Sequence, residues 1–236
     1  LSVYVVDAPI GGTSLRIRGK PGAISVVGIA PRGTIWSLAP AVYMDKIVVD
    51  RNAAAALVPQ CLDAPAAWTL ALIARQKKKS VRDLSVIVLD RPRNQDLIHE
   101  IRQCGARVLL RDEGDAEGAL IAATADTSVD VLMGIGGVSQ GVLAACAVKA
   151  SGGAMLARLR PQNAVERENI QRAGLDESRI MTCAELVSSK QIFFAATSIT
   201  DSALLRAMQF WGSYASTYSL LIRSETGTRR FIHAEH

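Results

Sequence analysis

The chain has 236 residues, of which 49% are hydrophobic and 21% are charged, with 18 Gly and 8 Pro. This composition excludes an intrinsically disordered protein and predicts one globular chain with a sizeable core. The richest apolar run, 131–148, is interrupted by glycines, Ser139 and Gln140, so we expect no membrane span. The net charge of +5 is dispersed, without a basic stripe interleaved with aromatic residues, and we expect no nucleic-acid binding.

The first sixty residues are rich in Val and Ile and are punctuated by Gly and Pro turns, which predicts β-strands. The expected strands are 2–6, 23–29, 33–36 and 43–49. Because only short turns separate these strands, we predict that they pair as an antiparallel meander.

From residue 63 onward, helical and strand-like segments alternate, which is typical of a parallel sheet covered by helices. The expected helices are 66–75, 95–104, 116–124, 139–150 and 165–173, with a short helix from Asp201. The expected strands are 84–89, 107–110, 129–135, 191–197, 218–223 and 228–232. The lysines at 77–79 are interpreted as a solvated helix end. We predict an α/β protein with an antiparallel N-terminal sheet half at 1–62 and an α/β half with a mixed or parallel sheet at 63–236.

The four cysteines, Cys61, Cys104, Cys146 and Cys183, are widely spaced, form no Cys-x-x-Cys pair and do not cluster with the three histidines. This spacing argues against zinc, and it favours buried free thiols of an intracellular protein over a secreted disulfide framework. The chain begins at Leu1 rather than Met, within a strand-like run, which leaves open that an N-terminal portion has been cleaved or lost.

The segment 129–141 runs from an apolar strand through several glycines into a predicted helix. Free backbone N–H groups at the start of a helix hold anions, so this junction predicts a phosphate cradle. A tight turn without a ligand is the alternative that the spacing leaves open. The Gly-Lys-Ser/Thr of a P-loop is missing, and Ser139 stands where a dinucleotide motif needs its third glycine.

Charged side chains follow two predicted strands. Arg91 and Arg93 leave the first strand two residues apart and point to the same side, where two guanidinium groups can clamp one phosphate. A solvated loop is the alternative. Glu113 and Asp115 follow the next strand, and they either accept hydrogen bonds from sugar hydroxyls or begin a helix. Tyr43 is either a ligand-facing phenol or a core residue.

Together these segments resemble the class II fructose-1,6-bisphosphatases, including the photosynthetic members that also accept sedoheptulose 1,7-bisphosphate. The most specific matches are 133–149 and 152–155, and the supporting stretches are 43–46, 91–93, 113–115, 194–200 and 219–224. The resemblance runs from about Val3 to His233. It implies the sugar-phosphatase fold of layered helices and sheets, hydrolysis of a 1-phosphate with Mg²⁺ or Mn²⁺, a homo-oligomer, and a cytoplasmic or plastid-stroma location.

The same resemblance implies the roles of individual residues. Substrate contacts are implied for Gly12 and Thr13 at the scissile phosphate, Tyr43, Arg91 and Arg93 at the distal phosphate, and Glu113, Asp115 and Gly137 along the sugar. Asp7 and Thr13 are the candidate catalytic residues, and Asp7 is also a candidate metal ligand. Read without the resemblance, the segment 7–13 is only a turn.

The chain departs from the family pattern at two metal-ligand positions. Gln140 stands where the family has a Glu, and Gly11 replaces the Glu of the Asp-Pro-Ile-Glu-Gly-Thr motif, which here also carries one inserted residue after Asp7. Asp7 is the only carboxylate side chain among residues 1–44. Because Mg²⁺ and Mn²⁺ need several anionic oxygen ligands, we expect no resident metal unless further ligands come from elsewhere.

These observations favour a degenerate bisphosphatase relative that is catalytically impaired or inactive. Such a protein would retain the fold and sugar-bisphosphate binding in a regulatory or structural role. The alternative is an active metal-dependent fructose-1,6-/sedoheptulose-1,7-bisphosphatase that is completed by a preceding segment or by a partner chain. A third hypothesis is a pure assembly component, for which Phe210 and Trp211 would cover a subunit contact or, alternatively, be buried within the monomer.

Overall fold

The computed structural model describes residues 2–37 and 39–236. The strands are β1 (Val3–Gly11), β2 (Ile24–Pro31), β3 (Tyr43–Val49), β4 (Ser85–Leu89), β5 (Arg107–Arg111), β6 (Val131–Gly137), β7 (Ala154–Leu159), β8 (Met181–Thr182), β9 (Phe193–Ser198), β10 (Gln209–Trp211), β11 (Tyr214–Arg223) and β12 (Thr228–Glu235). The α-helices are α1 (Thr13–Ile17), α2 (Ala66–Lys77), α3 (Gln95–Gln103), α4 (Asp115–Ala123), α5 (Val138–Ser151), α6 (Ala164–Arg172) and α7 (Cys183–Leu186). Short 3₁₀ turns are η1 (Ala54–Ala56), η2 (Pro59–Leu62), η3 (Val81–Asp83) and η4 (Pro92–Asn94).

The first sheet is antiparallel, in the order β1-β2-β9-β11-β10, with β12 paired to the other edge of β11. Its central strands β2 and β9 alternate between buried and more exposed residues, as expected for a sheet that packs on one face. Val26 and Ala30 of β2 and Phe194 and Ala196 of β9 are buried toward the core. This face contacts α5, so one side of the antiparallel sheet forms a wall of the main core.

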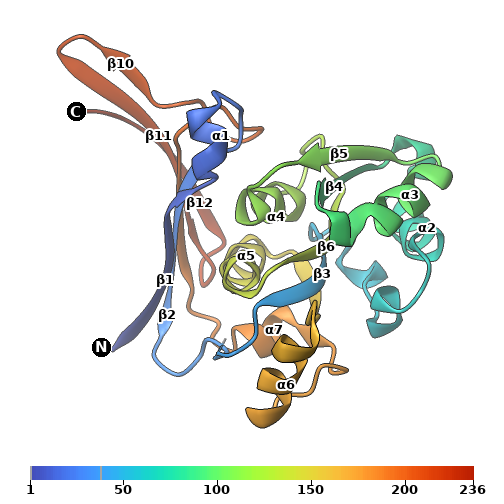
Figure 1. Cartoon of the computed structure of the whole chain (residues 1–236). Coiled ribbons are helices and arrows are strands. Elements are labelled where there is room, and N and C mark those ends of the chain that lie inside the picture. The colour runs from blue at the N-terminus through green and yellow to red at the C-terminus, as the bar shows by residue number, and fades with distance from the viewer. Residues whose placement is uncertain (1, 38) are drawn as a thin grey trace.

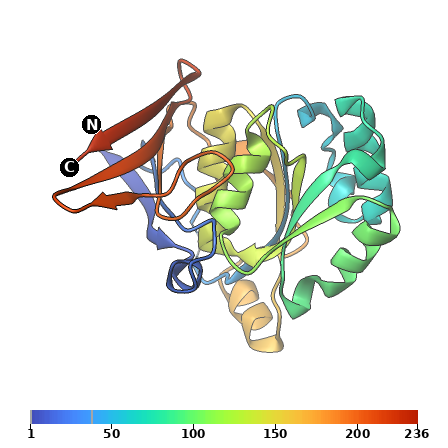
Figure 2. The same cartoon turned by 90° about the horizontal axis from the view of Figure 1, so that it is seen from above.

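The second sheet is mixed, in the order β5-β4-β6-β3-β7-β8. Strands β5, β4 and β6 are parallel, whereas β3 is antiparallel to both β6 and β7. Helices α4 and α5 lie between the two sheets, and α2 and α3 cover the opposite face of the mixed sheet (Figure 1). Figure 2 shows the same layers from above. The carboxyl ends of β4, β5 and β6 therefore share one edge, close to the starts of α4 and α5.

Helix α5 is buried on most of its surface because both sheets contact it. Small residues permit this close packing. A Cβ atom at Gly141 would lie 2.1 Å from Sδ of Met44, and one at Gly28 would lie 3.0 Å from Cβ of Cys146. A helix that is apolar on most faces is typical of such a position. The packing therefore fixes the start of α5 at the edge where β6 ends.

The α/β class, the antiparallel sheet and the mixed sheet are confirmed, and the expected meander is wrong. Strand β3 belongs to the mixed sheet and does not pair with the first two strands. Each sheet contains strands from both sides of residue 62, and the division into halves at that residue stays a prediction. Among the described residues, no helix has the length and apolar character needed to cross a bilayer.

Three local expectations are also corrected. The segment 33–36 forms only an isolated bridge between Ile35 and Val187. The chain after Asp201 forms a loop and not a helix, and within it the Asp201 carboxylate accepts the N–H of Ala207. The lysine run at the end of α2 is not simply solvated, since the Lys77 side chain is 9% exposed and lies within 3.0 Å of both Asp50 and Asp130.

Candidate functional site

The carboxyl edge of the mixed sheet carries the loop after β4, and Asn94 holds this loop in place. Pro92 begins η4, and the preceding Arg91 is extended, as residues before proline usually are. The Asn94 amide donates to the carbonyls of Leu89 and Ile135 and accepts from the N–H of Ile135 at 2.8 Å. Asn94 is 1% exposed, so it joins the ends of β4 and β6. Sequence reasoning missed this positioning residue.

Arg93 and Tyr43 form one wall of the candidate site. The Arg93 guanidinium lies over the Tyr43 ring, 4.6 Å from its centroid, and Nε of Arg93 donates to the carbonyl of Ile135 at 3.1 Å. Tyr43 also pairs with Gly137 across β3 and β6, directly before α5 begins. The structure thus brings together Arg93, Tyr43 and Gly137. Arg91 is partly exposed, and its side chain contacts the carbonyl of Asp90.

A hydrogen bond connects the two sheets on the other side of the site. The Ser14 hydroxyl donates to Oε1 of Glu113 at 2.6 Å, which joins α1 to the loop between β5 and α4. Gly12 precedes α1 with φ 80°, a left-handed conformation that favours glycine. Thr13 is exposed, and its hydroxyl lies 3.4 Å from the carbonyl of Ile10. Because Ser14 directly follows Gly12 and Thr13, this hydrogen bond places both residues near Glu113. Sequence reasoning did not single out Ser14.

Asp115 is buried beneath β6. Its Oδ2 lies 2.6 Å from Nζ of Lys46, and the two side chains are 6% and 0% exposed. Among the described residues, neither atom has a hydrogen-bond partner of good geometry, so the contact is an ion pair without further support. A Cβ atom at Gly136 would lie 2.0 Å from the same oxygen, so the backbone of β6 covers this pair directly. Asp115 is therefore near the edge, but it faces inward.

Asp7 lies apart from these residues. Successive strand residues face opposite sides of a sheet, and Ala8 is buried in the core whereas Asp7 is exposed. The Asp7 carboxylate therefore lies on the face of β1 opposite the core. Gly11 ends β1 in register with Ile24, and Gln140 is partly exposed in the first turn of α5.

The residues at this edge do not fit a divalent metal cluster. Within 2–37 and 39–236, no group of three or more His, Cys, Asp or Glu side chains could hold a metal ion. Asp115 is already paired with Lys46, and Glu113 accepts from Ser14. The two altered positions, Gly11 and Gln140, contribute no carboxylate.

Glu117 is a second buried carboxylate that sequence reasoning missed. It lies in the first turn of α4, is 1% exposed, and has Nη2 of Arg111 at 3.7 Å from its Oε2. Neither of its oxygens has a hydrogen-bond partner among the described residues. Burial raises the pKa of Glu117 to about 7, with Arg111 acting in the opposite direction. The available signal was a second acidic residue, two positions after Asp115, in a helix whose other residues are Ala, Gly, Leu and Ile.

Two layers of helices on a mixed sheet define an α/β protein, and arginines and glycines lie at the carboxyl ends of its parallel strands. The chain belongs to the family of bacterial, glpX-encoded fructose-1,6-bisphosphatases, whose model matches residues 2–236. This finding confirms the resemblance expected from the sequence.

Two relatives illustrate the similarity. The D-fructose 1,6-bisphosphatase class 2/sedoheptulose 1,7-bisphosphatase of Synechococcus sp. (strain JA-3-3Ab) is 36% identical over 249 residues, covering 100% of this chain and 71% of the relative. The fructose-1,6-bisphosphatase class 2 of Haemophilus influenzae is 36% identical over 247 residues, covering 99% of this chain and 73% of the relative.

Proposed function

We propose that this protein binds a sugar bisphosphate at the carboxyl edge of its mixed sheet and is catalytically impaired or inactive as a phosphatase. It would then serve a regulatory or structural role. The observation that supports the proposal is that residues implied for phosphate binding are kept while residues implied for metal binding are replaced. The side chains for which phosphate contacts are implied, Arg91, Arg93 and Tyr43, are present, whereas Gly11 and Gln140 replace the carboxylates implied for metal binding.

Metal-dependent hydrolysis requires negatively charged side chains that hold the metal ions. Hydrolysis of phosphate monoesters is among the slowest uncatalysed reactions, and metal ions supply both the activated water and the stabilisation of the leaving oxygen. Mg²⁺ and Mn²⁺ are held by several oxygen ligands, which are mostly carboxylates when the protein supplies them. Asp115 is paired with Lys46, and Asp7 faces away from the core, so these two acids do not serve that purpose.

Two measurements on the same purified chain test the proposal. Isothermal titration with fructose 1,6-bisphosphate should show saturable binding, and the Arg91→Ala/Arg93→Ala variant should lose most of it because both guanidinium groups are gone. A phosphate-release assay with Mn²⁺ should show no turnover above the variant's background. Absence of heat at high ligand concentration would refute sugar-bisphosphate binding.

The alternative function is an active metal-dependent fructose-1,6-/sedoheptulose-1,7-bisphosphatase. Membership of the bisphosphatase family favours it, provided that carboxylates come from a segment outside this chain or from a partner chain. Its test is the rate of phosphate release with Mn²⁺ from fructose 1,6-bisphosphate and sedoheptulose 1,7-bisphosphate. High activity that rises further in Gln140→Glu would establish this alternative and refute the inactive one.

We also propose that the protein is a homo-oligomer in a cytoplasmic or stromal compartment. Phe210 and Trp211, on the hairpin of β10 and β11, are 75% and 54% exposed, and this hairpin extends beyond the rest of the antiparallel sheet (Figure 1). Exposed aromatic pairs of this kind are common at subunit contacts. Analytical ultracentrifugation tests the association, and a monomer at all concentrations, for both the unaltered chain and Trp211→Ser, would exclude it.

A further inference from the structure

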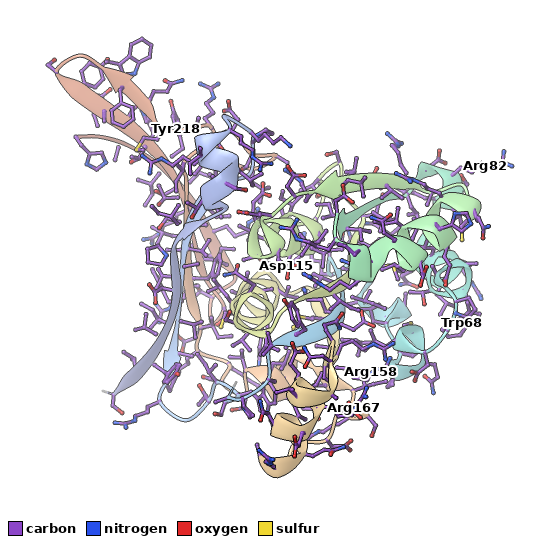
Figure 3. All side chains as sticks on the ribbon, in the orientation of Figure 1. Trp68, Arg82, Asp115, Arg158, Arg167 and Tyr218 are labelled. Carbon is purple, nitrogen blue, oxygen red and sulfur yellow. The ribbon has the colours of Figure 1, made fainter. Side chains whose placement is uncertain are left out.

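A cavity of about 530 Å³ lies beyond Arg93, where β6 and β7 end and the chain turns into α6. Four arginines line it, namely Arg93, Arg158, Arg160 and Arg167, together with a single carboxylate, Glu177. We call this cavity the arginine pocket. Figure 3 shows Arg158 and Arg167 near α6, at the end of the molecule away from the β10–β11 hairpin. None of the implied substrate contacts other than Arg93 lines it.

Two of the four guanidinium groups are already neutralised. Nε of Arg167 donates to both carboxylate oxygens of Glu177 at 3.1 Å. Arg158 pairs with Asp63 and donates to the carbonyl of Leu62. These two arginines therefore contribute little free positive charge to the cavity.

The other two guanidinium groups have no carboxylate partner within 4 Å among the described residues. Arg160 is exposed, and Arg93 has its ring contact with Tyr43 and one bond to a backbone carbonyl. Both also line an adjoining cavity of about 260 Å³, whose acidic residues are Asp45, Asp96 and Glu100. Of these three, Asp45 is the carboxylate on which the charges of Arg158 and Arg160 act. These three carboxylates line the adjoining cavity and not the arginine pocket, whose own lining of four arginines and Glu177 has an excess of positive charge and leaves room for an anionic ligand.

The chemistry of the ligand follows from this arrangement. A guanidinium group offers paired donors that match the oxygens of a phosphate, and two such groups suit a dianion. A cavity of several hundred Å³ is in the range of small-molecule sites. We propose that the arginine pocket binds a phosphate monoester dianion, with Arg160 as its main ligand and Arg93 as the wall shared with the candidate site.

Two sources could supply this phosphate. It is either the distal phosphate of the sugar bisphosphate, in which case this inference rests on the proposed function, or it belongs to a separate phosphorylated ligand. In the first case Arg160 would help to determine the length of sugar that the site accepts. In the second case the pocket would be a distinct site that responds to free phosphate or to another phosphate ester.

The decisive experiment is isothermal titration with inorganic phosphate at low ionic strength. The unaltered chain should bind phosphate saturably, and Arg160→Ala should weaken this affinity by at least about tenfold, which is about 1.4 kcal/mol. Arg160→Lys should retain an intermediate affinity. The matched control is Arg172→Ala, because Arg172 lies on the same α6 end of the fold, is 70% exposed and pairs with Glu168. Equal affinities for the unaltered chain and Arg160→Ala, or no saturable binding, would overturn the proposal.

A second set of titrations distinguishes the two sources. If the phosphate belongs to the sugar, fructose 1,6-bisphosphate should displace inorganic phosphate, and Arg160→Ala should weaken binding of fructose 6-phosphate but not of fructose 1-phosphate. If the site is separate, the chain saturated with fructose 1,6-bisphosphate should still take up one equivalent of phosphate. Phosphate binding that depends on Arg160, without any binding of the bisphosphate, would support the arginine pocket and refute the proposed function.

Discussion

Nζ of Lys46 lies 2.6 Å from Oδ2 of Asp115, in a contact that joins the middle of β3 to the first residue of α4. Both side chains are almost completely buried, and β6 passes directly over them at Gly136. Each charge stabilises the other, because an unpaired charge at such a buried position would destabilise the folded protein. Asp115, for which the resemblance implies a substrate contact, therefore pairs with Lys46 beneath β6 and holds α4 and β3 together.

Removing one member of this pair should strongly destabilise the protein. Asp115→Asn and Lys46→Met should each lower the free energy of unfolding by about 3–5 kcal/mol, because each leaves a buried group without its partner. The double variant Lys46→Met/Asp115→Leu should recover most of the loss. Urea denaturation measures all three. Lys20→Met is the control, since the Lys20–Asp112 pair is 49% and 33% exposed and should contribute little to stability. Single variants as stable as the unaltered chain would contradict the prediction.

Two adjacent glycines at the end of β6 should respond differently to the same substitution. A Cβ atom at Gly136 would lie 2.0 Å from Asp115 and 2.6 Å from Lys46, whereas one at Gly137 has no neighbour within 4 Å. Gly136→Ala should therefore lower the melting temperature by several degrees, since crowding a packed site costs about 1–3 kcal/mol. Gly137→Ala should change it little, because its φ of −66° suits alanine. Similar melting temperatures for the two variants would show that β6 moves freely away from the ion pair.

The pKa of Glu117 predicts a specific pH dependence of stability. Because burial raises it from 4.5 to about 7, the folded protein holds a proton that the unfolded chain releases between these pH values. This carboxylate therefore costs no stability at low pH, and its cost grows as the pH rises from 4.5 to 7. Glu117→Gln removes that cost. The variant should be more stable than the unaltered chain by up to about 3 kcal/mol at pH 8, and nearly equal to it at pH 4.

Chemical denaturation at pH 4, 6 and 8 measures this difference directly. Glu113→Gln is a suitable control, because Glu113 is partly exposed and accepts a hydrogen bond from Ser14. A loss of stability in Glu117→Gln at pH 8 would mean that the ion pair with Arg111 outweighs the effect of burial, and the direction of the pKa shift would be wrong.

The sequence predicted the elements around the site better than their partners. The strand expected at 129–135 and the helix at 139–150 correspond to β6 and α5, because an apolar run followed by glycines and small residues is a local pattern. The pairing of β3 with β6 and β7 was missed, because the residue pattern of a strand does not show whether its partner strand is near or distant in sequence. Helix α1 has five residues, too few for a period to be recognised.

The site residues that could be anticipated are those that belong to a local sequence pattern. Tyr43 begins an expected strand, whereas Arg93 and Gly137 each follow one, and the structure brings the three residues together. The inward position of Asp115 could not be anticipated, because its partner Lys46 is distant in sequence and no local pattern connects them. Whether Asp7 faces the core depends on the register of β1, and a shift of one residue exchanges the two faces.

The stacked pair of Arg93 and Tyr43 makes a prediction about ligand affinity. Lysine keeps the positive charge but loses the planar group that lies over the ring and donates in pairs, so Arg93→Lys should weaken fructose 1,6-bisphosphate binding about tenfold. The unfolding free energy should change by less than about 1 kcal/mol, because Arg93 is partly exposed. Isothermal titration gives the affinity. Arg206→Lys is the matched control, since Arg206 also lies over a tyrosine, Tyr218, at 5.9 Å on the antiparallel sheet, and should leave the affinity unchanged. Equal weakening in both variants would show that the loss of affinity does not come from the Arg93–Tyr43 contact, and it would contradict the prediction.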